Sequence, residues 1–341
     1  MCRSVPGFFI LSLIDLLPNN HYHITMAFAV SQQLNRYYDL YKNIDVTFSK
    51  EVVSTLNFDP KQVFVRAAGG QWPCIINSAS MTKAKIICGK KSGFIENLRN
   101  GVTSANIRFA FFDTEGKAPL SFFVAAKLVG ISSYEAGNHD LVLITFEYTQ
   151  RAPDDLIEKL GILLEANINS QKRQNERVVI TPEISRKIGL VEKGTVVYVD
   201  AVPRRCLIRD LSFSGAKILL VGVANFLMNK EVILRFAFED PRSAFGIKGR
   251  TVRTESVEGR KDLVALAIQY YPQNIPMMYK MYLNKYFSVM RKPSSDGFGD
   301  DFLEDVAPVS SAAPFSSPID TTMTPLTPPP ADSAPEQASQ Q

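Results

Sequence analysis

The chain has 341 residues, of which 45% are hydrophobic and 21% are charged, and this ordinary globular composition and length predict two domains. Four cysteines without a C-x-x-C pair and only three histidines leave too few ligands for a zinc cluster, and indicate a reduced, cytoplasmic protein without a metal cofactor. The net charge is +4, but residues 293–341 hold eight acidic residues and no Lys or Arg, which leaves +12 on residues 1–292. Unless that charge serves solubility alone, it favours an anionic partner: a nucleotide, a nucleic acid or a membrane surface.

The N-terminal half contains one helical segment followed by strands. We interpret residues 1–25 as a disordered leader or a misassigned start, because their apolar run is interrupted by Asp15 and is too short to cross a bilayer. A helix is predicted over 28–42, with Leu34, Tyr37, Tyr38 and Tyr41 on one stripe. Strands are then predicted at 63–65, 81–88, 105–113, 120–129 and 141–148, a spacing typical of an antiparallel barrel or sandwich.

The period changes at residues 154–168, where leucines recur at helical spacing, and this helix is expected to close a first domain spanning 26–168. The polar, basic stretch 169–177 begins a second domain, 169–292. Its strands are predicted at 178–180, 195–202, 205–210, 216–221, 231–238, 246–254 and 263–270. Segment 181–194 resembles a small inserted helix and loop, with Thr181 as its cap and Pro182 in its first turn.

The last predicted helix covers residues 275–290 and is followed by a change in composition. Its apolar stripe is expected to pack on the barrel rather than on a membrane, and consists of Ile275, Met278, Tyr282, Tyr286, Val289 and Met290. Residues 293–341 are rich in Pro, Ser, Thr and acidic residues, and hold nine of the twenty prolines. Such a segment buries too little apolar surface to offset its ordering entropy, so we predict a disordered tail.

Two short patterns in the second domain carry the functional argument. The first is Arg173-x-x-x-Arg177, and the second is Asp210-x-Ser212-x-x-Gly215 between two predicted strands. In this order they resemble the ligand-binding signature of the PilZ family, over about residues 170–290. The upstream half is similar to the PilZ-like barrel of two-domain receptors of the flagellar-brake type. The resemblance implies a mainly β fold of two antiparallel barrels joined by a helix and basic linker, with a C-terminal helix.

The resemblance also implies a ligand, cyclic di-GMP, and a receptor rather than an enzyme. Arg173 and Arg177 are expected to clamp the ligand from a mobile loop, because a guanidinium can fork onto a phosphate or onto guanine O6 and N7. Asp210 can accept from the guanine N1–H and N2–H₂ donors, Ser212 can add a hydrogen bond, and Gly215 permits positive φ or close backbone approach. Lys172 is an additional candidate. Ligand binding is expected to rearrange the two domains and so to regulate a protein partner in the flagellar motor or the envelope machinery.

Several alternatives stay open at the level of sequence. The arginines are also compatible with a solvated linker, and Asp210 with Ser212 can simply build a hairpin turn. A second match, Arg205-x-x-x-Arg209, is rejected as the clamp because it lies in a predicted strand against Asp210. The basic body is also compatible with a barrel that binds single-stranded nucleic acid, or with a PilZ-like adaptor without ligand. The sequence contains no G-x-S-x-G, Walker loop, H-E-x-x-H or dinucleotide fingerprint, so we expect no catalytic residues.

Overall fold

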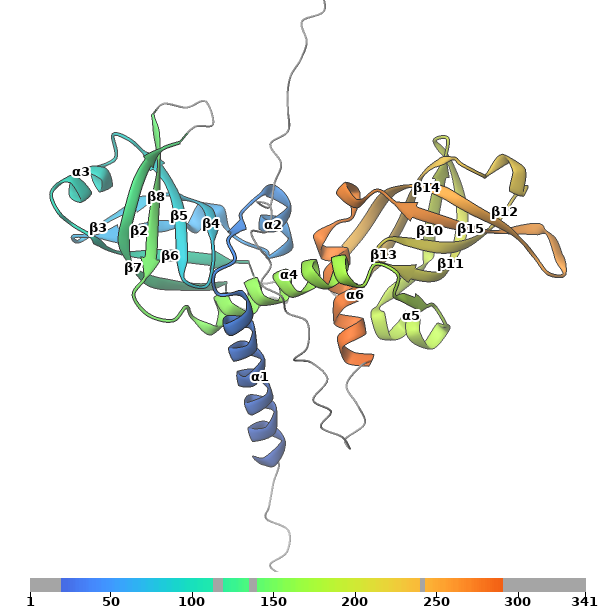
Figure 1. Cartoon of the computed structure of the whole chain (residues 1–341), viewed down its shortest axis with the longest axis horizontal. Helices are drawn as coiled ribbons and strands as arrows, with labels where there is room; N and C mark the ends of the chain where they lie inside the picture. The colour runs from blue at the N-terminus through green and yellow to red at the C-terminus, as the bar shows by residue number, and fades with distance from the viewer. Residues whose placement is uncertain (1–19, 113–118, 135–139, 240–242, 291–341) are drawn as a thin grey trace, which may run out of the picture. The chain divides into compact units, whose positions relative to one another are not determined.

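The structure is a computed structural model that describes residues 20–112, 119–134, 140–239 and 243–290 (Figure 1). The predicted tail at 293–341 and residues 1–19 of the predicted leader lie outside these described ranges. The two halves of the described chain form two antiparallel sheets, one of eight strands and one of seven. The predicted mainly β fold class is therefore confirmed.

The N-terminal sheet has the strand order β1-β4-β5-β8-β7-β6-β2-β3, with antiparallel pairing throughout. Its core comes from alternate residues, such as Ile107 and Phe109 of β6 and Ile144 and Phe146 of β8, all of which are fully buried. The elements of this half are α1 Asn20–Tyr41, β1 Val46–Thr47, α2 Lys50–Thr55, η1 Pro60–Gln62, β2 Phe64–Ala67, β3 Gly70–Pro73, β4 Ile75–Ala79, β5 Lys83–Gly89, α3 Gly93–Arg99, β6 Ser104–Phe111, β7 Leu120–Ser133, β8 Leu141–Tyr148 and α4 Asp154–Lys172.

Helices α1 and α4 pack against each other through the stripes that the sequence predicted. Tyr37 and Tyr41 of α1 are buried, and the Tyr37 hydroxyl donates to the Glu165 carboxylate of α4 at 3.2 Å. The helix begins at Asn20 rather than at residue 28, so residues 20–25, predicted as part of a disordered leader, are helical. Two acidic residues in the first turn of α4 and Lys172 in its last turn complement the helix dipole.

The C-terminal half is a closed barrel of six strands in the order β10-β13-β14-β15-β12-β11, closed by pairing of β10 with β11. Strand β11 uses one edge twice: its first half pairs with β10, and its last three residues pair with the short strand β9. The elements are β9 Arg177–Val179, α5 Pro182–Ile188, β10 Leu190–Val199, β11 Val202–Ser212, β12 Gly215–Val221, η2 Ala224–Phe226, β13 Glu231–Phe238, β14 Ser243–Val257, β15 Arg260–Tyr270, η3 Pro272–Asn274 and α6 Met277–Met290.

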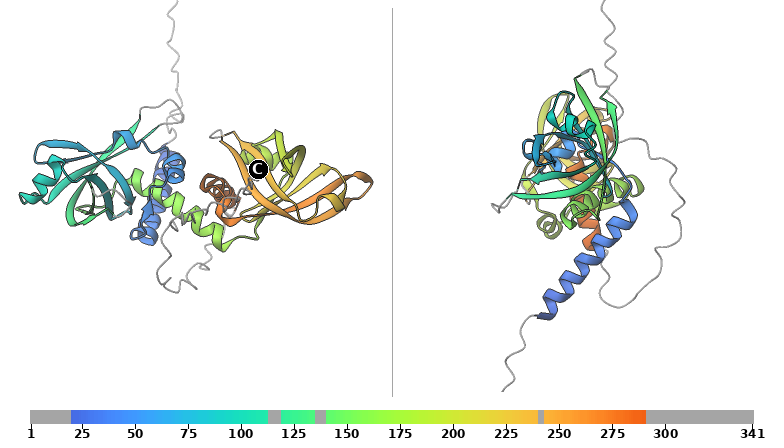
Figure 2. Two further views of the ribbon diagram at one scale, coloured as in Figure 1. Left: turned by 90° about the horizontal axis from the view of Figure 1, so that it is seen from above. Right: turned by 90° about the vertical axis from the view of Figure 1, so that its left-hand side faces the viewer.

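Helix α6 packs on this barrel, as Figure 1 and the left view of Figure 2 show. The predicted packing against the barrel is confirmed, although the centre of the contact differs from the predicted stripe. Tyr279, Leu283 and Phe287 are the most buried members, whereas Met278, Tyr282 and Tyr286 pack at the margin of the core. The shift of one residue places aromatic rings over the barrel core, where Tyr279 contacts Phe236 and Tyr270 edge to face.

Helix α5 begins where its sequence predicts. The Thr181 hydroxyl accepts from the Ile184 amide at 3.2 Å, Pro182 occupies the first turn, and Gly189 closes the helix in the left-handed conformation at φ 67°. The residues after it, predicted as a loop, already belong to β10. Among the described helices, none has the length and apolar character needed to cross a membrane.

Candidate functional site

The D-x-S-x-x-G pattern lies at a tight hairpin between β11 and β12. Asp210 and Ser212 are among the last three residues of β11, and Gly215 is the first residue of β12. Phe213 and Ser214 make the turn between the two strands. Phe213 points into the core, where its ring lies 5.6 Å from that of Phe287 in α6. The hairpin is therefore anchored to the barrel core from beneath.

Gly215 is needed for close backbone approach rather than for an unusual φ, since its φ is not positive. A Cβ at this position would lie 2.2 Å from the carbonyl oxygen of Ile268 in β15. A Cβ added at Gly249 of β14 would likewise lie 2.3 Å from the carbonyl oxygen of Gln269. The two glycines let β12 and β14 close tightly on β15 at the end of the barrel where the pattern lies.

Ser212 is buried and its polar groups are used within the hairpin. Its hydroxyl donates to the carbonyl of Gly215 at 3.1 Å, and only 1% of the residue is exposed. Its backbone carbonyl accepts from the Tyr279 hydroxyl of α6 at 2.7 Å. The turn reading considered from the sequence therefore describes Ser212 well, because its hydrogen bonds fix the hairpin.

The arginines of the R-x-x-x-R pattern lie where α4 passes into the barrel. Lys172 is in the last turn of α4, Arg173 is its C-cap, and a turn over residues 173–175 leads into β9. Arg177 was predicted in a loop, but it is the first residue of β9 and lies opposite Ser212. The three-residue pairing of β9 with β11 thus brings one end of the first pattern beside the second.

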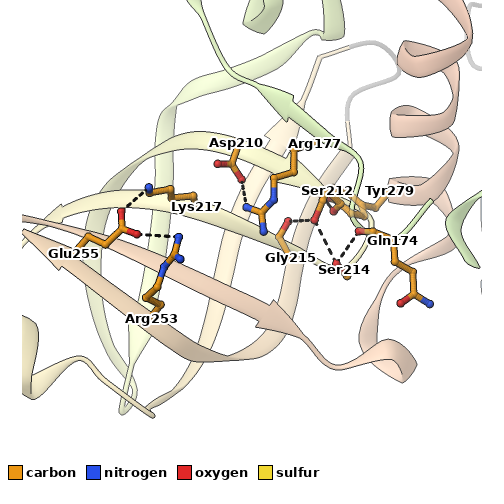
Figure 3. A network of polar contacts seen from close by, with 10 residues as sticks. All are labelled: Gln174, Arg177, Asp210, Ser212, Ser214, Gly215, Lys217, Arg253, Glu255 and Tyr279. Atoms are coloured by element: carbon orange, nitrogen blue, oxygen red, sulfur yellow. Dashed lines mark hydrogen bonds and ion pairs between the residues drawn. The ribbon is translucent and has the colours of Figure 1, made fainter. Parts of the chain in front are cut away.

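An ion pair joins the two patterns directly. Arg177 Nη1 lies 2.8 Å from Asp210 Oδ1, and the Asp210 side chain is only 14% exposed whereas that of Arg177 is 53% exposed (Figure 3). A second tie lies beside it, because the Ser214 hydroxyl donates to the Gln174 carbonyl at 2.8 Å. The turn that carries the arginines is held on the hairpin by these two contacts.

The polar surface continues beyond the predicted residues. Lys217 of β12 is the cross-strand partner of Asp210, and its Nζ lies 2.7 Å from Glu255 Oε2 of β14. Arg253 Nη2 lies 2.8 Å from the other oxygen of the same carboxylate. The hydrogen bond and charge of Lys217, with a smaller contribution from Arg253, hold the pKa of Glu255 below its usual value.

Sequence reasoning missed these residues for identifiable reasons. Ser214 stands inside the motif but at a position that the family pattern leaves open. Tyr279 could have been found from its spacing of four with Leu283, whereas Lys217, Arg253 and Glu255 depend on strand register, which the sequence does not reveal.

The second R-x-x-x-R match lies in a strand, as predicted, since Arg205 and Arg209 both belong to β11 and both are exposed. Arg209 also lines a small cavity of about 160 Å³ between β11 and the segment predicted as an insertion, together with Ile180, Pro182 and Leu207. The segment predicted as an insertion therefore forms one wall of a cavity that Arg209 lines.

The sequence matches two family models: a PilZN3 domain over residues 32–167 and a PilZ domain over residues 171–279. A protein of Treponema denticola named "Cyclic di-GMP binding protein" is 88% identical over 314 residues, which cover 92% of this chain and all of that protein.

Solved structures that the chain matches include Borreliella burgdorferi PlzA in complex with c-di-GMP, at 25% identity and a TM-score of 0.35, covering 76% of this chain and 99% of PlzA. Escherichia coli YcgR in complex with c-di-GMP is 13% identical, with a TM-score of 0.23, covering 77% of this chain and 90% of YcgR. From the two family matches and the close relative, the chain belongs to the PilZ-domain family, with a PilZN3 domain preceding its PilZ domain.

Proposed function

We propose that this chain is a cyclic di-GMP receptor whose ligand binds on the outer wall of the PilZ barrel. The observation that carries the proposal is the Arg177–Asp210 pair at 2.8 Å, which puts a phosphate-binding cation and a guanine-binding carboxylate side by side. The name of the 88% identical relative supports the same ligand. The family consists of binding effectors, and the chain is not an enzyme.

The residue chemistry fits a guanine dinucleotide. Arg177 and Arg173 supply planar guanidinium groups for a phosphate or for the O6 and N7 edge of guanine, with Lys172 as a further cation. Asp210 stays an acceptor for the guanine N1–H and N2–H₂ donors, and its low exposure strengthens such bonds. Ser212 and Gly215 act by fixing the hairpin that presents Asp210, because the serine hydroxyl is committed to the Gly215 carbonyl.

The test is calorimetric titration of cyclic di-GMP into the full chain and into single arginine variants. Arg173→Ala and Arg177→Ala should each weaken binding by about 10- to 100-fold, as expected for the loss of charge-assisted hydrogen bonds. Arg205→Ala is the matched control, since it lies in the second R-x-x-x-R match and is exposed on the same barrel. Cyclic di-AMP should not bind. Absence of cyclic di-GMP binding by the wild type, with the fold intact, would refute the proposal.

We further propose that ligand binding changes the arrangement of the two domains, for which 26–168 and 169–292 are the proposed limits. Two helices connect the site with the first half of the chain. Tyr279 of α6 holds the Ser212 carbonyl, and Asn284 of the same helix accepts from Asn169 of α4 at 2.7 Å and donates to Glu165 at 3.2 Å. Because Arg173 is the C-cap of α4, a ligand that engages this arginine acts on the end of that helix.

Small-angle X-ray scattering with and without saturating ligand tests the rearrangement. The profile should change for the wild type and stay constant for Arg177→Ala, whereas an unchanged wild-type profile would contradict the switch. The regulated partner is proposed to be a cytoplasmic protein of the motility or envelope machinery, and its co-purification should then depend on the ligand.

A further inference from the structure

A row of residues crosses five adjacent strands at nearly one level of the barrel wall, and four of these strands contribute a charged residue. Asp210 of β11 pairs in register with Lys217 of β12, Lys217 pairs with Ala267 of β15, and Ala267 pairs with Arg253 of β14. Arg177 of β9 stands at the other end of the row, against Asp210. The row therefore continues the candidate site away from the arginine turn, as Figure 3 shows.

The register of this row depends on two β-bulges. One lies between Ile208 and Asp210 in β11, and the other between Thr251 and Arg253 in β14. Bulges re-aim side chains and commonly occur beside functional sites. Here they leave Asp210 and Arg253 at the same level, about three strand spacings, or ~14 Å, apart.

The floor between Lys217 and the β14 residues consists of small side chains. Ala267 lies opposite both Lys217 and Arg253, and Ala265 lies opposite both Leu219 and Glu255. Larger side chains at these positions would fill the space between the flanking charged residues. The surface is thus a strip in which two alanines lie between charged residues of the flanking strands.

The two cations of the strip share one carboxylate, so the strip carries a net charge of one positive unit. Lys217 and Arg253 are 2.7 and 2.8 Å from Glu255, and their side chains are 30% and 66% exposed. An ammonium has three donors and a guanidinium five, and Arg253 contacts Glu255 through Nη2. Both cations can therefore donate to a phosphate without first losing Glu255.

We propose that Lys217 and Arg253 form a second anion-binding subsite, which takes the part of the dinucleotide that extends past Asp210. The inference rests on the proposed function and deepens it, because it assigns a phosphate of the same ligand to residues outside both sequence patterns. Glu255 acts as a positioning residue: in the free protein it holds the two cations toward each other over the alanine floor.

The experiment is calorimetric titration of cyclic di-GMP into full-length Lys217→Met and Arg253→Met. Each substitution should weaken binding about tenfold, which corresponds to ~1.4 kcal/mol. Arg260→Met is the matched control, because Arg260 is also a paired β-hairpin arginine, 3.0 Å from Asp262 and 60% exposed. It should bind as the wild type does. Thermal melts should show all three variants folded, since exposed ion pairs contribute little to stability.

Glu255→Gln adds a readout of opposite sign. The glutamine amide oxygen can still accept from the two cations and hold them in place, whereas the negative charge that repels a phosphate is removed. The affinity should therefore stay unchanged or rise severalfold, and a tenfold loss would overturn the assignment to the cations. Wild-type affinity in both Lys217→Met and Arg253→Met, together with loss of binding in Arg177→Ala, would refute the subsite while leaving the receptor proposal standing. No binding by the wild type would overturn both proposals.

Discussion

The requirement for glycine at position 215 gives a sharp test of the barrel geometry. In Gly215→Ala the new Cβ would start 2.2 Å from the Ile268 carbonyl oxygen and 3.3 Å from its carbon. An ordinary contact needs more than 3.4 Å, so β12 and β15 must separate by over 1 Å. Both neighbours are backbone atoms in paired strands and cannot rotate away as a side-chain end would. Overpacking of this kind costs about 1–3 kcal/mol.

For a barrel of this size, that loss lowers the melting temperature by roughly 5–15 °C, which differential scanning calorimetry resolves easily. The control is Gly246→Ala in β14, where the nearest atom, Ile233 Cγ2, lies at an ordinary 3.6 Å. That variant should be neutral or stabilised by about 0.4–1 kcal/mol, because alanine restricts the unfolded chain. A Gly215→Ala melting temperature within about 2 °C of the wild type would refute the close-approach explanation of this motif glycine.

Three further predictions concern buried groups. Two of them concern the C-terminal half, and the third concerns one cysteine in each half. Tyr279→Phe leaves the buried Ser212 carbonyl without its 2.7 Å donor and should cost about 1–2 kcal/mol, seen as a lower urea midpoint at an unchanged m-value. Burial raises the pKa of Tyr270 and Tyr279 above the ordinary 10.0, so the folded state prefers the neutral phenols. The stability they support is complete below pH 10 and should decline as the pH rises further; a urea midpoint that stays constant to pH 11 would contradict this. Burial also raises the pKa of Cys206 to about 12, and a hydrogen bond with Cys88 and burial raise that of Cys74. Mass mapping after alkylation at pH 8 should therefore find both thiols protected in the native protein and labelled after unfolding, and equal labelling in both states would contradict the burial.

Periodic segments of the sequence predicted their elements closely. The alternation of Ile107 and Phe109 marks β6, and the leucines of 154–168 mark α4, because a buried face repeated over several residues leaves a clear pattern. The cap and the first-turn proline located the start of α5, whereas its end at Gly189 was not predicted. Such signals can be recognised from the sequence because all the residues that determine the element lie within the segment itself.

Shorter elements were predicted less closely, because tertiary pairing defines their ends. Strand β9 was predicted at 178–180 but begins at Arg177, because it pairs with the edge of β11 that β10 has left. Helix α2 has six residues, with Ser49 as its cap. Arg177 was consequently expected in a loop, although the pattern that contains it was identified. The extension of the site through Lys217 and Arg253 was equally out of reach, because two bulges set its register.

The ion pairs of the candidate site suggest how an exposed barrel wall can bind one anion selectively. Two of these pairs join different strands: Arg177 with Asp210 at 2.8 Å, and Lys217 with Glu255 at 2.7 Å. The third joins Arg253 and Glu255 of one strand at 2.8 Å. Such pairing lowers the net field and holds long side chains in place, so that less rotamer entropy is lost when the ligand arrives. In the proposed complex both carboxylates oppose a simple anion, and we expect Asp210 to accept the N–H donors of guanine. A phosphate alone meets this repulsion, whereas a molecule with both phosphates and guanines satisfies cations and carboxylates together, and the site selects for that combination.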